Sequence, residues 1–138
     1  MKRVTIMLLV LVTVTIVAIE PKFPKDPAIS PDGEMVCFAY MNDLWLVPFS
    51  GGEARRITVS DGRDHSPVYS PDGHWIAFTS DREGFSAIYI IPADGGQSRL
   101  VSRDVPSASD WFNDSQRILG TRNEIQTGTG FYEFPING

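Results

Sequence analysis

Short apolar segments separated by turn-forming residues recur along most of this chain. The clearest set lies in the middle of the sequence, at residues 66–69, 75–79, 88–91 and 99–102. Each segment has four or five residues, which suits a β-strand and is short for a helix. Pro, Asp and Gly fill the intervals, and these residues favour tight turns. The pattern therefore predicts an all-β fold built from short strands.

The predicted inner strands are apolar at both even and odd positions. Residues 44–47, 75–78 and 88–91 are almost entirely large and hydrophobic. Because alternate side chains of a strand point to opposite faces of its sheet, strands of this kind are covered on both faces. The segments at residues 55–58 and 98–101 are more polar. We therefore expect sheets that are buried on both faces and end in a polar outer strand.

The predicted strands repeat with a period of about forty residues. Ser-Pro-Asp-Gly occurs at residues 30–33 and again at 70–73, and double glycines follow at residues 51–52 and 95–96. A third copy has Phe-Asn-Asp-Ser at residues 112–115, where the other two have Ser-Pro-Asp-Gly. Each copy reads as a strand, a tight turn, a strand, a loop, a strand, a double-glycine turn and a strand.

Four-stranded sheets that repeat at this period are typical of the blades of a β-propeller. The predicted fold class is therefore all-β, a partial β-propeller with two complete four-stranded blades and an incomplete third. The blades are expected at about residues 26–58, 65–102 and 108–138. In the first blade Asn42-Asp43 is the expected two-residue hairpin turn. In the third, residues 128–130 are expected to belong to a long loop.

The third copy stops before its fourth strand, since Gly138 aligns with Gly95. Propellers typically have four to eight blades, so two explanations are open. The chain is either the amino-terminal piece of a longer protein or one of several copies that assemble into a ring. We favour the first because the stop falls inside a blade. In both cases the expected partner is the remaining set of blades, in the same or another chain.

The first nineteen residues have the layout of a secretory signal. Lys2 and Arg3 precede an uncharged apolar run at residues 4–19, and a polar stretch follows. Sixteen apolar residues are fewer than the roughly 20 that a membrane span needs. We expect residues 1–19 to be a signal peptide, cleaved or retained as a membrane anchor, because the run is too long for a buried first strand. Residues 20–138 would then be an exported propeller segment, periplasmic or extracellular, with membrane contact only through the leader.

Composition narrows the choice of partners. The chain is 42% hydrophobic and 21% charged, as in globular domains. Its formal net charge of −5 argues against a nucleic-acid partner, because such proteins usually present a basic face. The single cysteine, Cys37, excludes an internal disulfide and lies in an apolar stretch, where a free cysteine is usually a small buried hydrophobe.

The second copy carries a family resemblance. Ser-Pro-Asp-Gly, an apolar strand, Ser80-Asp81-Arg82-Glu83-Gly84, a second apolar strand and Pro-Ala-Asp-Gly-Gly resemble the WD-like blade of TolB-type and tricorn-protease-type propellers. The resemblance extends over residues 26–138, although the first copy lacks the Ser-Asp-Arg-x-Gly loop. The leader and the first copy are similar to the start of secreted tricorn-like proteases. A segment of that kind is implied to be a non-catalytic scaffold that guides peptides toward a serine nucleophile in a distant carboxy-terminal domain.

Two other functions remain open. A TolB-like periplasmic module would bind partner proteins at the cell envelope without hydrolysing them. A propeller at the amino end of an oligopeptidase or an amidohydrolase would share the same blades. Blades alone do not separate these possibilities, because a fold does not define a function.

We find no catalytic residue, cofactor-binding residue or metal ligand in the sequence. Asp64-His65-Ser66 contains the three residue types of a catalytic triad, but adjacent residues of an extended segment diverge, so chance explains it better. The sequence contains no Gly-x-Ser-x-Gly, His-Glu-x-x-His or Gly-x-x-x-x-Gly-Lys motif.

The candidate binding residues come from the loops that a propeller places around its central channel. Arg63, Asp64 and His65 precede the first strand of the second copy, and Asp81 and Arg82 follow its second strand. The resemblance implies that Asp81-Arg82 forms either an ion pair between blades or a brace within a turn. A peptide or protein is the expected ligand at these loops.

Overall fold

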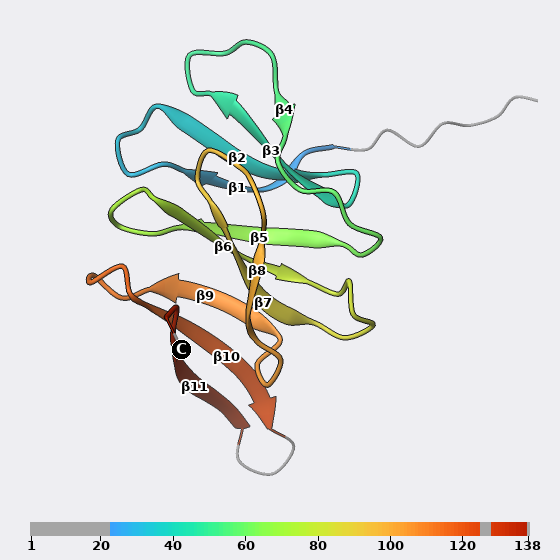
Figure 1. Ribbon diagram of the computed structural model, residues 1–138, viewed down its shortest axis with the longest axis vertical. Coiled ribbons are helices and arrows are strands. Elements are labelled where there is room, and N and C mark those ends of the chain that lie inside the picture. The colour runs from blue at the N-terminus through green and yellow to red at the C-terminus, as the bar shows by residue number, and fades with distance from the viewer. Residues whose placement is uncertain (1–22, 125–127, 138) are drawn as a thin grey trace, which may run out of the picture.

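The computed structural model describes residues 23–124 and 128–137 (Figure 1). The predicted leader at residues 1–19 lies outside the described residues. The described residues form eleven β-strands. No helix long and apolar enough to cross a membrane occurs in this part of the chain.

The strands form three antiparallel sheets, which confirms the predicted all-β, partial-propeller fold class. The first sheet runs in the order β1 (Lys25–Ile29), β2 (Met35–Tyr40), β3 (Asp43–Pro48), β4 (Arg55–Arg56). The second runs β5 (Asp64–Tyr69), β6 (Trp75–Ser80), β7 (Ala87–Pro92), β8 (Arg99–Ser102). The third consists of β9 (Ser107–Trp111), β10 (Arg117–Glu124) and β11 (Gly128–Pro135), with β10 in the middle.

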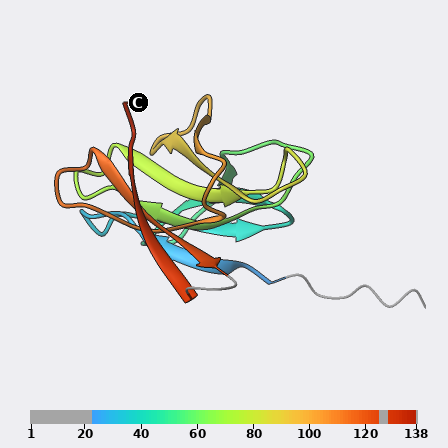
Figure 2. The same cartoon turned by 90° about the horizontal axis from the view of Figure 1, so that it is seen from below.

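The three sheets lie one above another like the blades of a fan (Figure 1), and the third lies nearest the viewer when the molecule is seen from below (Figure 2). Two hydrophobic clusters hold them together. The cluster between the first and second sheets includes Cys37, Leu44, Leu46, Ile76 and Phe78. The cluster between the second and third sheets includes Ala77, Ile88, Ile90, Trp111 and Ile118. The second sheet is therefore buried on both faces, because its alternate residues enter different clusters.

The Ser-Pro-Asp-Gly turn folds as its residues predict. Gly73 has a φ of 75°, which an L side chain rarely adopts, and its N–H donates to the Ser70 carbonyl at 2.9 Å. The Ser70 hydroxyl donates to the Asp72 carboxylate at 2.6 Å and accepts the Trp75 N–H at 3.0 Å. In the third sheet Ser115 takes the left-handed position of the glycine, and its hydroxyl accepts the N–H of Asp72 at 3.0 Å. The turn motif thus also links neighbouring sheets.

Two predicted details were wrong. The hairpin of the first sheet turns at Met41-Asn42, one residue before the expected pair, because both residues have positive φ and Asp43 already pairs with Tyr40. The expected long loop of the third copy is shorter, because β10 and β11 pair along eight residues, out to Glu124 and Gly128. Gly128 and Gly130, which were expected in a loop, therefore belong to strand β11.

The innermost strands of the first two sheets are also joined. Each carries a β-bulge whose first residue, Asp26 in β1 and Ser66 in β5, has a positive φ. The Ser66 N–H donates to the Asp26 carboxylate at 3.2 Å. In both sheets the entry to the inner strand and the hairpin between the second and third strands lie on the same side, because successive strands are antiparallel. We call this the entry side.

Candidate functional site

The five residues predicted as candidate binding residues come together on the entry side of the second sheet. Arg63, Asp64 and His65 lie at the start of β5, and Asp81 and Arg82 directly follow β6. The Arg63 N–H donates to the Asp81 carboxylate at 2.6 Å, and the Asp81 N–H returns to the Arg63 carbonyl at 3.4 Å. The two loops are therefore fastened to each other by one hydrogen bond to the Asp81 side chain and one between backbone groups.

Asp64 and Arg82 form a buried ion pair at the centre of this group. The side chain of Asp64 is 0% exposed and that of Arg82 is 20% exposed. The Nη2 atom of Arg82 lies 3.0 Å from both carboxylate oxygens. The Ser80 hydroxyl donates to Oδ1 at 2.6 Å. A buried carboxylate requires partners of this kind, because an isolated buried charge is costly.

The guanidinium of Arg82 extends across the rest of the sheet. It lies 4.4 Å from the ring centroid of Tyr89 in β7 and 5.4 Å from that of Phe78 in β6. Its Nη1 donates at 2.7 Å to the hydroxyl of Ser98, just before β8. Arg82 thus contacts groups from all four strands or their ends. The resemblance implied for Asp81-Arg82 either an ion pair between blades or a brace within a turn. The ion pair that Arg82 forms with Asp64 lies within the second sheet. We call this ion pair and its hydrogen bonds the brace.

The same group is connected to the first sheet. The Asp64 N–H donates to the carbonyl of Asn42 at 2.8 Å. The Ser60 hydroxyl, in the segment that connects the two sheets, lies 3.3 Å from each oxygen of Asp64. A Cβ atom on Gly62 would collide with the backbone of Arg82, so this position has room only for glycine. The connecting segment is therefore packed directly onto the brace.

His65 does not complete a triad with its neighbours. Its Nδ1 lies 3.0 Å from the hydroxyl of Ser66, but the oxygens of Asp64 are occupied by Arg82, Ser80 and Ser60. Burial and then the positive charge of Arg63 lower the pKa of His65 from its usual value. Among residues 23–124 and 128–137, no three His, Cys, Asp or Glu residues group in a way that could hold a metal ion.

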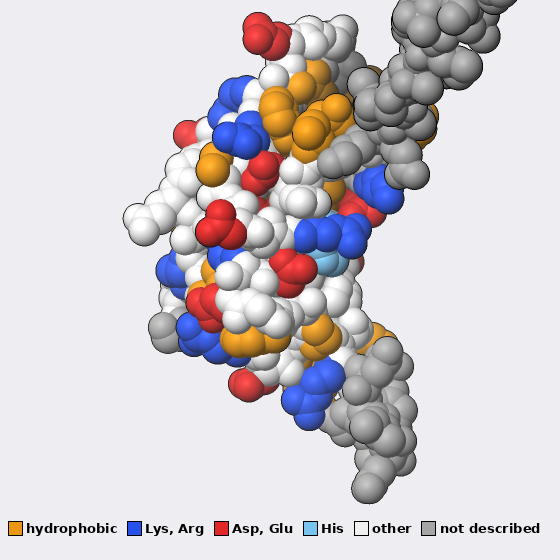
Figure 3. Space-filling view, turned by 90° about the vertical axis from the view of Figure 1, so that its right-hand side faces the viewer, with side chains coloured by type: hydrophobic (Ala, Val, Ile, Leu, Met, Phe, Trp, Pro, Cys, Tyr) orange, Lys and Arg blue, Asp and Glu red, His pale blue; other side chains and the backbone are white. Residues whose placement is uncertain are grey.

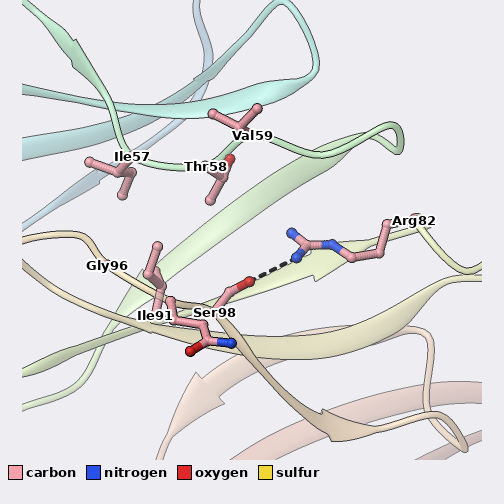
Figure 4. A pocket seen from close by; sticks show the side chains of 8 residues that line it. Ile57, Thr58, Val59, Arg82, Ile91, Gly96 and Ser98 are labelled. Carbon is pink, nitrogen blue, oxygen red and sulfur yellow. Dashed lines mark hydrogen bonds between the residues drawn. The ribbon is translucent and has the colours of Figure 1, made fainter.

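A pocket of about 290 Å³ opens between the outer segments of the first two sheets (Figure 4). One wall is the segment after β4 and the other is the segment before β8. Arg82 lies at one end, where it is fixed by Ser98. The lining residues are Ile57, Thr58, Val59, Arg82, Ile91, Gly96, Gln97 and Ser98.

The pocket wall formed by residues 57–59 is fixed to strand β3 of the first sheet. The hydroxyl of Thr58 accepts the backbone N–H of Leu44 at 2.8 Å and so replaces a backbone partner at the end of β4. Val59 is 76% exposed at the rim, whereas Ile57 is 8% exposed and Ile91 is 1% exposed. The pocket therefore combines two buried isoleucines and an exposed valine with the polar side chains of Arg82, Gln97 and Ser98.

Charges of both signs are mixed over the entry side, and hydrophobic side chains gather toward the first sheet (Figure 3). Arg103 and Glu83 form an exposed ion pair at 2.9 Å near the brace. Sequence reasoning missed Ser60, Thr58 and Ser98. No sequence motif identifies these residues, because each contact joins segments that are distant in the sequence. Ser60 contacts Asp64, Thr58 contacts Leu44, and Ser98 contacts Arg82.

Comparison with known proteins assigns nearly all of the repeated region to one family. A family model described as "Tricorn protease N-terminal beta propeller domain" matches residues 21–135. Tricorn protease homolog 1 of Streptomyces coelicolor is 38% identical over 72 residues, which are 52% of this chain and 7% of that protein. The chain therefore spans less than a tenth of the length of this relative.

Solved structures share the fold. The tricorn protease superposes with a TM-score of 0.67 at 19% identity, over 86% of this chain and 14% of that one. TolB from Acinetobacter baumannii gives a TM-score of 0.67 at 25% identity, over 82% of this chain and 30% of that one. The predicted resemblance to TolB-type and tricorn-type propellers is confirmed.

Proposed function

Since the chain belongs to the family of tricorn protease N-terminal β-propeller domains, we propose that it is the non-catalytic, peptide-guiding part of a tricorn-like serine peptidase. Its role is to bind peptides, and the peptide bond is cleaved elsewhere in the protein. The observation that carries this proposal is the pocket between the first two sheets, which is lined by Ile57, Val59 and Ile91 beside polar side chains.

The size and charge of the pocket favour an apolar side chain of a peptide. Ligand pockets usually have about 300–1,000 Å³, so a volume of about 290 Å³ suits one or two side chains better than a large cofactor. The charge of Arg82 is balanced by Asp64 at 3.0 Å. What remains for a ligand is the surface of Ile57 and Ile91 together with the exposed amide of Gln97, because Thr58 is 4% exposed and its hydroxyl accepts the Leu44 N–H. The amide of Gln97 supplies hydrogen bonds to a peptide backbone without demanding a charged residue.

The brace supports this function by keeping the walls in place. Arg82 joins β5, β7 and the segment before β8, and one wall of the pocket is that segment. A binding site binds its ligand more tightly when its groups are held in position before the ligand arrives, because less conformational freedom is lost on binding. Export of the protein is part of the proposal and rests on the signal-like layout of residues 1–19. Fractionation of cells that express the complete chain tests it.

A TolB-like role is the second candidate, and the structural likeness to TolB supports it. In that role the entry side would bind a folded partner protein. A role in an oligopeptidase or amidohydrolase stays open for the same blades. Short peptides that fail to bind while a folded protein binds would favour the TolB-like role.

The proposal is tested with the purified chain and a fluorescein-labelled tryptic digest of casein. Fluorescence anisotropy measures binding, and mass spectrometry measures whether the peptides stay intact. Val59→Asp places a charge on the pocket rim and is expected to weaken binding at least fivefold. Phe49→Asp is the matched control, because Phe49 is also largely exposed, at 65%, and lies outside the pocket lining. Equal binding by both variants, or cleavage of the peptides by the chain, would refute the proposal.

A further inference from the structure

The outer edge of the first sheet carries unpaired backbone groups beside the pocket. β4 is the last strand in the order of this sheet, so its outer edge pairs with no described strand. In an antiparallel pair, successive residues direct their N–H and carbonyl groups alternately toward the partner strand and away from it. The Ile57 N–H donates to the Leu44 carbonyl at 2.8 Å. The N–H and carbonyl of the neighbouring Arg56 therefore point away from β3, where another strand can reach them.

The edge of β4 leads directly into the pocket. Residues 57–59 continue the chain from β4 and form one wall, and residues 96–98 form the opposite wall (Figure 4). Ile57 belongs to the hydrophobic cluster between the first two sheets, so its side chain points toward the second sheet. Residues that lie opposite each other in paired strands point to the same face of the sheet. A residue opposite Ile57 in a strand beside β4 would therefore enter the pocket.

Two exposed arginines form β4, one on each face of the sheet. The Nη2 of Arg55 donates at 2.7 Å to the carbonyl of Asp94 in the second sheet, which is a neutral acceptor. Arg56 points to the other face, where its Nη1 lies 3.3 Å from Oδ2 of Asp43. The side chain of Arg56 is 46% exposed, so it is open to a further partner. A strand beside β4 therefore meets a positive charge on each of its faces.

These two charges select the kind of strand that can pair with β4. Charged side chains on an edge strand discourage pairing with other chains. Like charges directly opposite each other in paired strands are destabilising, whereas opposite charges are favourable. A basic strand is therefore excluded, and acidic residues opposite Arg55 and Arg56 are favoured. Because Arg55, Arg56 and Ile57 are consecutive, the matching strand carries two consecutive acidic residues next to an apolar one.

We propose that β4 binds an extended peptide segment as an additional antiparallel strand, with acidic residues opposite Arg55 and Arg56 and an apolar residue opposite Ile57. This inference rests on the proposed peptide-binding function and names the class of peptide and the way in which it binds. All the described strand pairs are antiparallel. In that direction the segment reads apolar-acidic-acidic from its amino end. The first acidic residue exchanges two backbone hydrogen bonds with Arg56.

The backbone pairing is tested with the purified chain and a fluorescein-labelled peptide, Ser-Thr-Val-Glu-Glu-Thr-Ser. Fluorescence anisotropy measures the affinity. N-methylation of the first glutamate removes the N–H that donates to the Arg56 carbonyl, and we expect binding to weaken at least tenfold. N-methylation of the second glutamate is the matched control, because the N–H of this residue, opposite Arg55, points away from β4. Its effect should stay within about twofold.

The charge pairing is tested with a peptide of nearly the same shape, Ser-Thr-Val-Gln-Gln-Thr-Ser, which is expected to bind about tenfold more weakly. Arg55→Gln and Arg56→Gln should each weaken binding of the glutamate peptide about threefold and leave binding of the glutamine peptide unchanged. Arg103→Gln is the matched control, because Arg103 is also exposed and lies outside the pocket lining. It should change the affinity for neither peptide.

The remaining outcomes count against the proposal. Equal weakening by the two N-methyl groups, or no binding of the glutamate peptide, would exclude strand pairing at β4, and both measurements use the natural chain. Equal affinity for the two peptides, or an effect of Arg103→Gln as large as that of Arg55→Gln, would exclude recognition of acidic residues by β4.

The casein-peptide assay separates this proposal from the proposed function. If Val59→Asp weakens casein-peptide binding while the two N-methylated peptides bind equally well, the pocket binds peptides but β4 does not pair with them. If the casein peptides bind equally to the natural chain and to Val59→Asp, the proposed function itself fails.

Discussion

Replacement of Arg82 by alanine tests the brace that supports the pocket. The substitution leaves the fully buried carboxylate of Asp64 without its cation and removes the contact with Tyr89. Removal of one partner of a buried ion pair costs about 3–5 kcal/mol. We expect the lower end, about 3 kcal/mol, because the side chain of Arg82 is 20% exposed and water can partly replace it. For a domain of this size that is a fall in melting temperature of roughly 10 °C or more.

Circular dichroism in the β-sheet region, followed during heating, measures the effect. Arg103→Ala is the matched control, because Arg103 pairs with Glu83 in the same region but both side chains are exposed, so its melting temperature should stay close to that of the natural chain. The double variant Asp64→Leu/Arg82→Leu should be less destabilised than Arg82→Ala, since no buried charge remains. Equal effects of Arg82→Ala and Arg103→Ala would refute the brace.

The remaining predictions concern three single positions. Thr58→Val is expected to cost about 1–3 kcal/mol in urea unfolding, because the buried N–H of Leu44 loses its acceptor. Gly62→Ala should also destabilise the folded chain, by about 1–3 kcal/mol in urea unfolding, because the added Cβ meets the backbone of Arg82. A variant as stable as the natural chain would contradict the close packing at Gly62. Burial raises the pKa of the Cys37 thiol to about 12, so the folded thiol should react with a soluble disulfide reagent at pH 8 only after unfolding. In the unfolded chain the thiol of Cys37 ionises near its ordinary pKa of 9.0, whereas in the folded chain it stays protonated up to about pH 12. The free energy of unfolding should therefore fall between pH 9 and 12. This fall should be smaller in Cys37→Ala.

Most of the fold could be predicted because it repeats. The strand spacing and the Ser-Pro-Asp-Gly turns depend on local residues, and Gly73 adopts the positive φ that the motif requires. The hairpin at Met41-Asn42 was misplaced by one residue, because a methionine with positive φ carries no turn signal. The length of β10 and β11 was also missed, since glycines in a strand read as a loop.

The candidate site was predicted incompletely. The motif identified Asp81 and Arg82, and chain order placed Asp64 near a loop, but the sequence did not show that Asp64 and Arg82 pair with each other. Their contact depends on the start of one strand meeting the loop after the next. The roles of Ser60 and Thr58 depend on how the first sheet packs against the second. Such contacts between segments have no signature in a single sequence.

Site-specific photo-crosslinking tests directly whether the chain binds peptides in the pocket without cleaving them. A benzophenone amino acid replaces Val59 at the pocket rim or, as the control, Phe49 outside the pocket lining. Each protein is irradiated with the casein peptides, and the adducts are analysed by mass spectrometry. We expect adducts at position 59 that carry intact peptides and far fewer adducts at position 49. Equal adducts at both positions, or peptides cut by the chain, would contradict peptide binding in the pocket by a non-catalytic propeller.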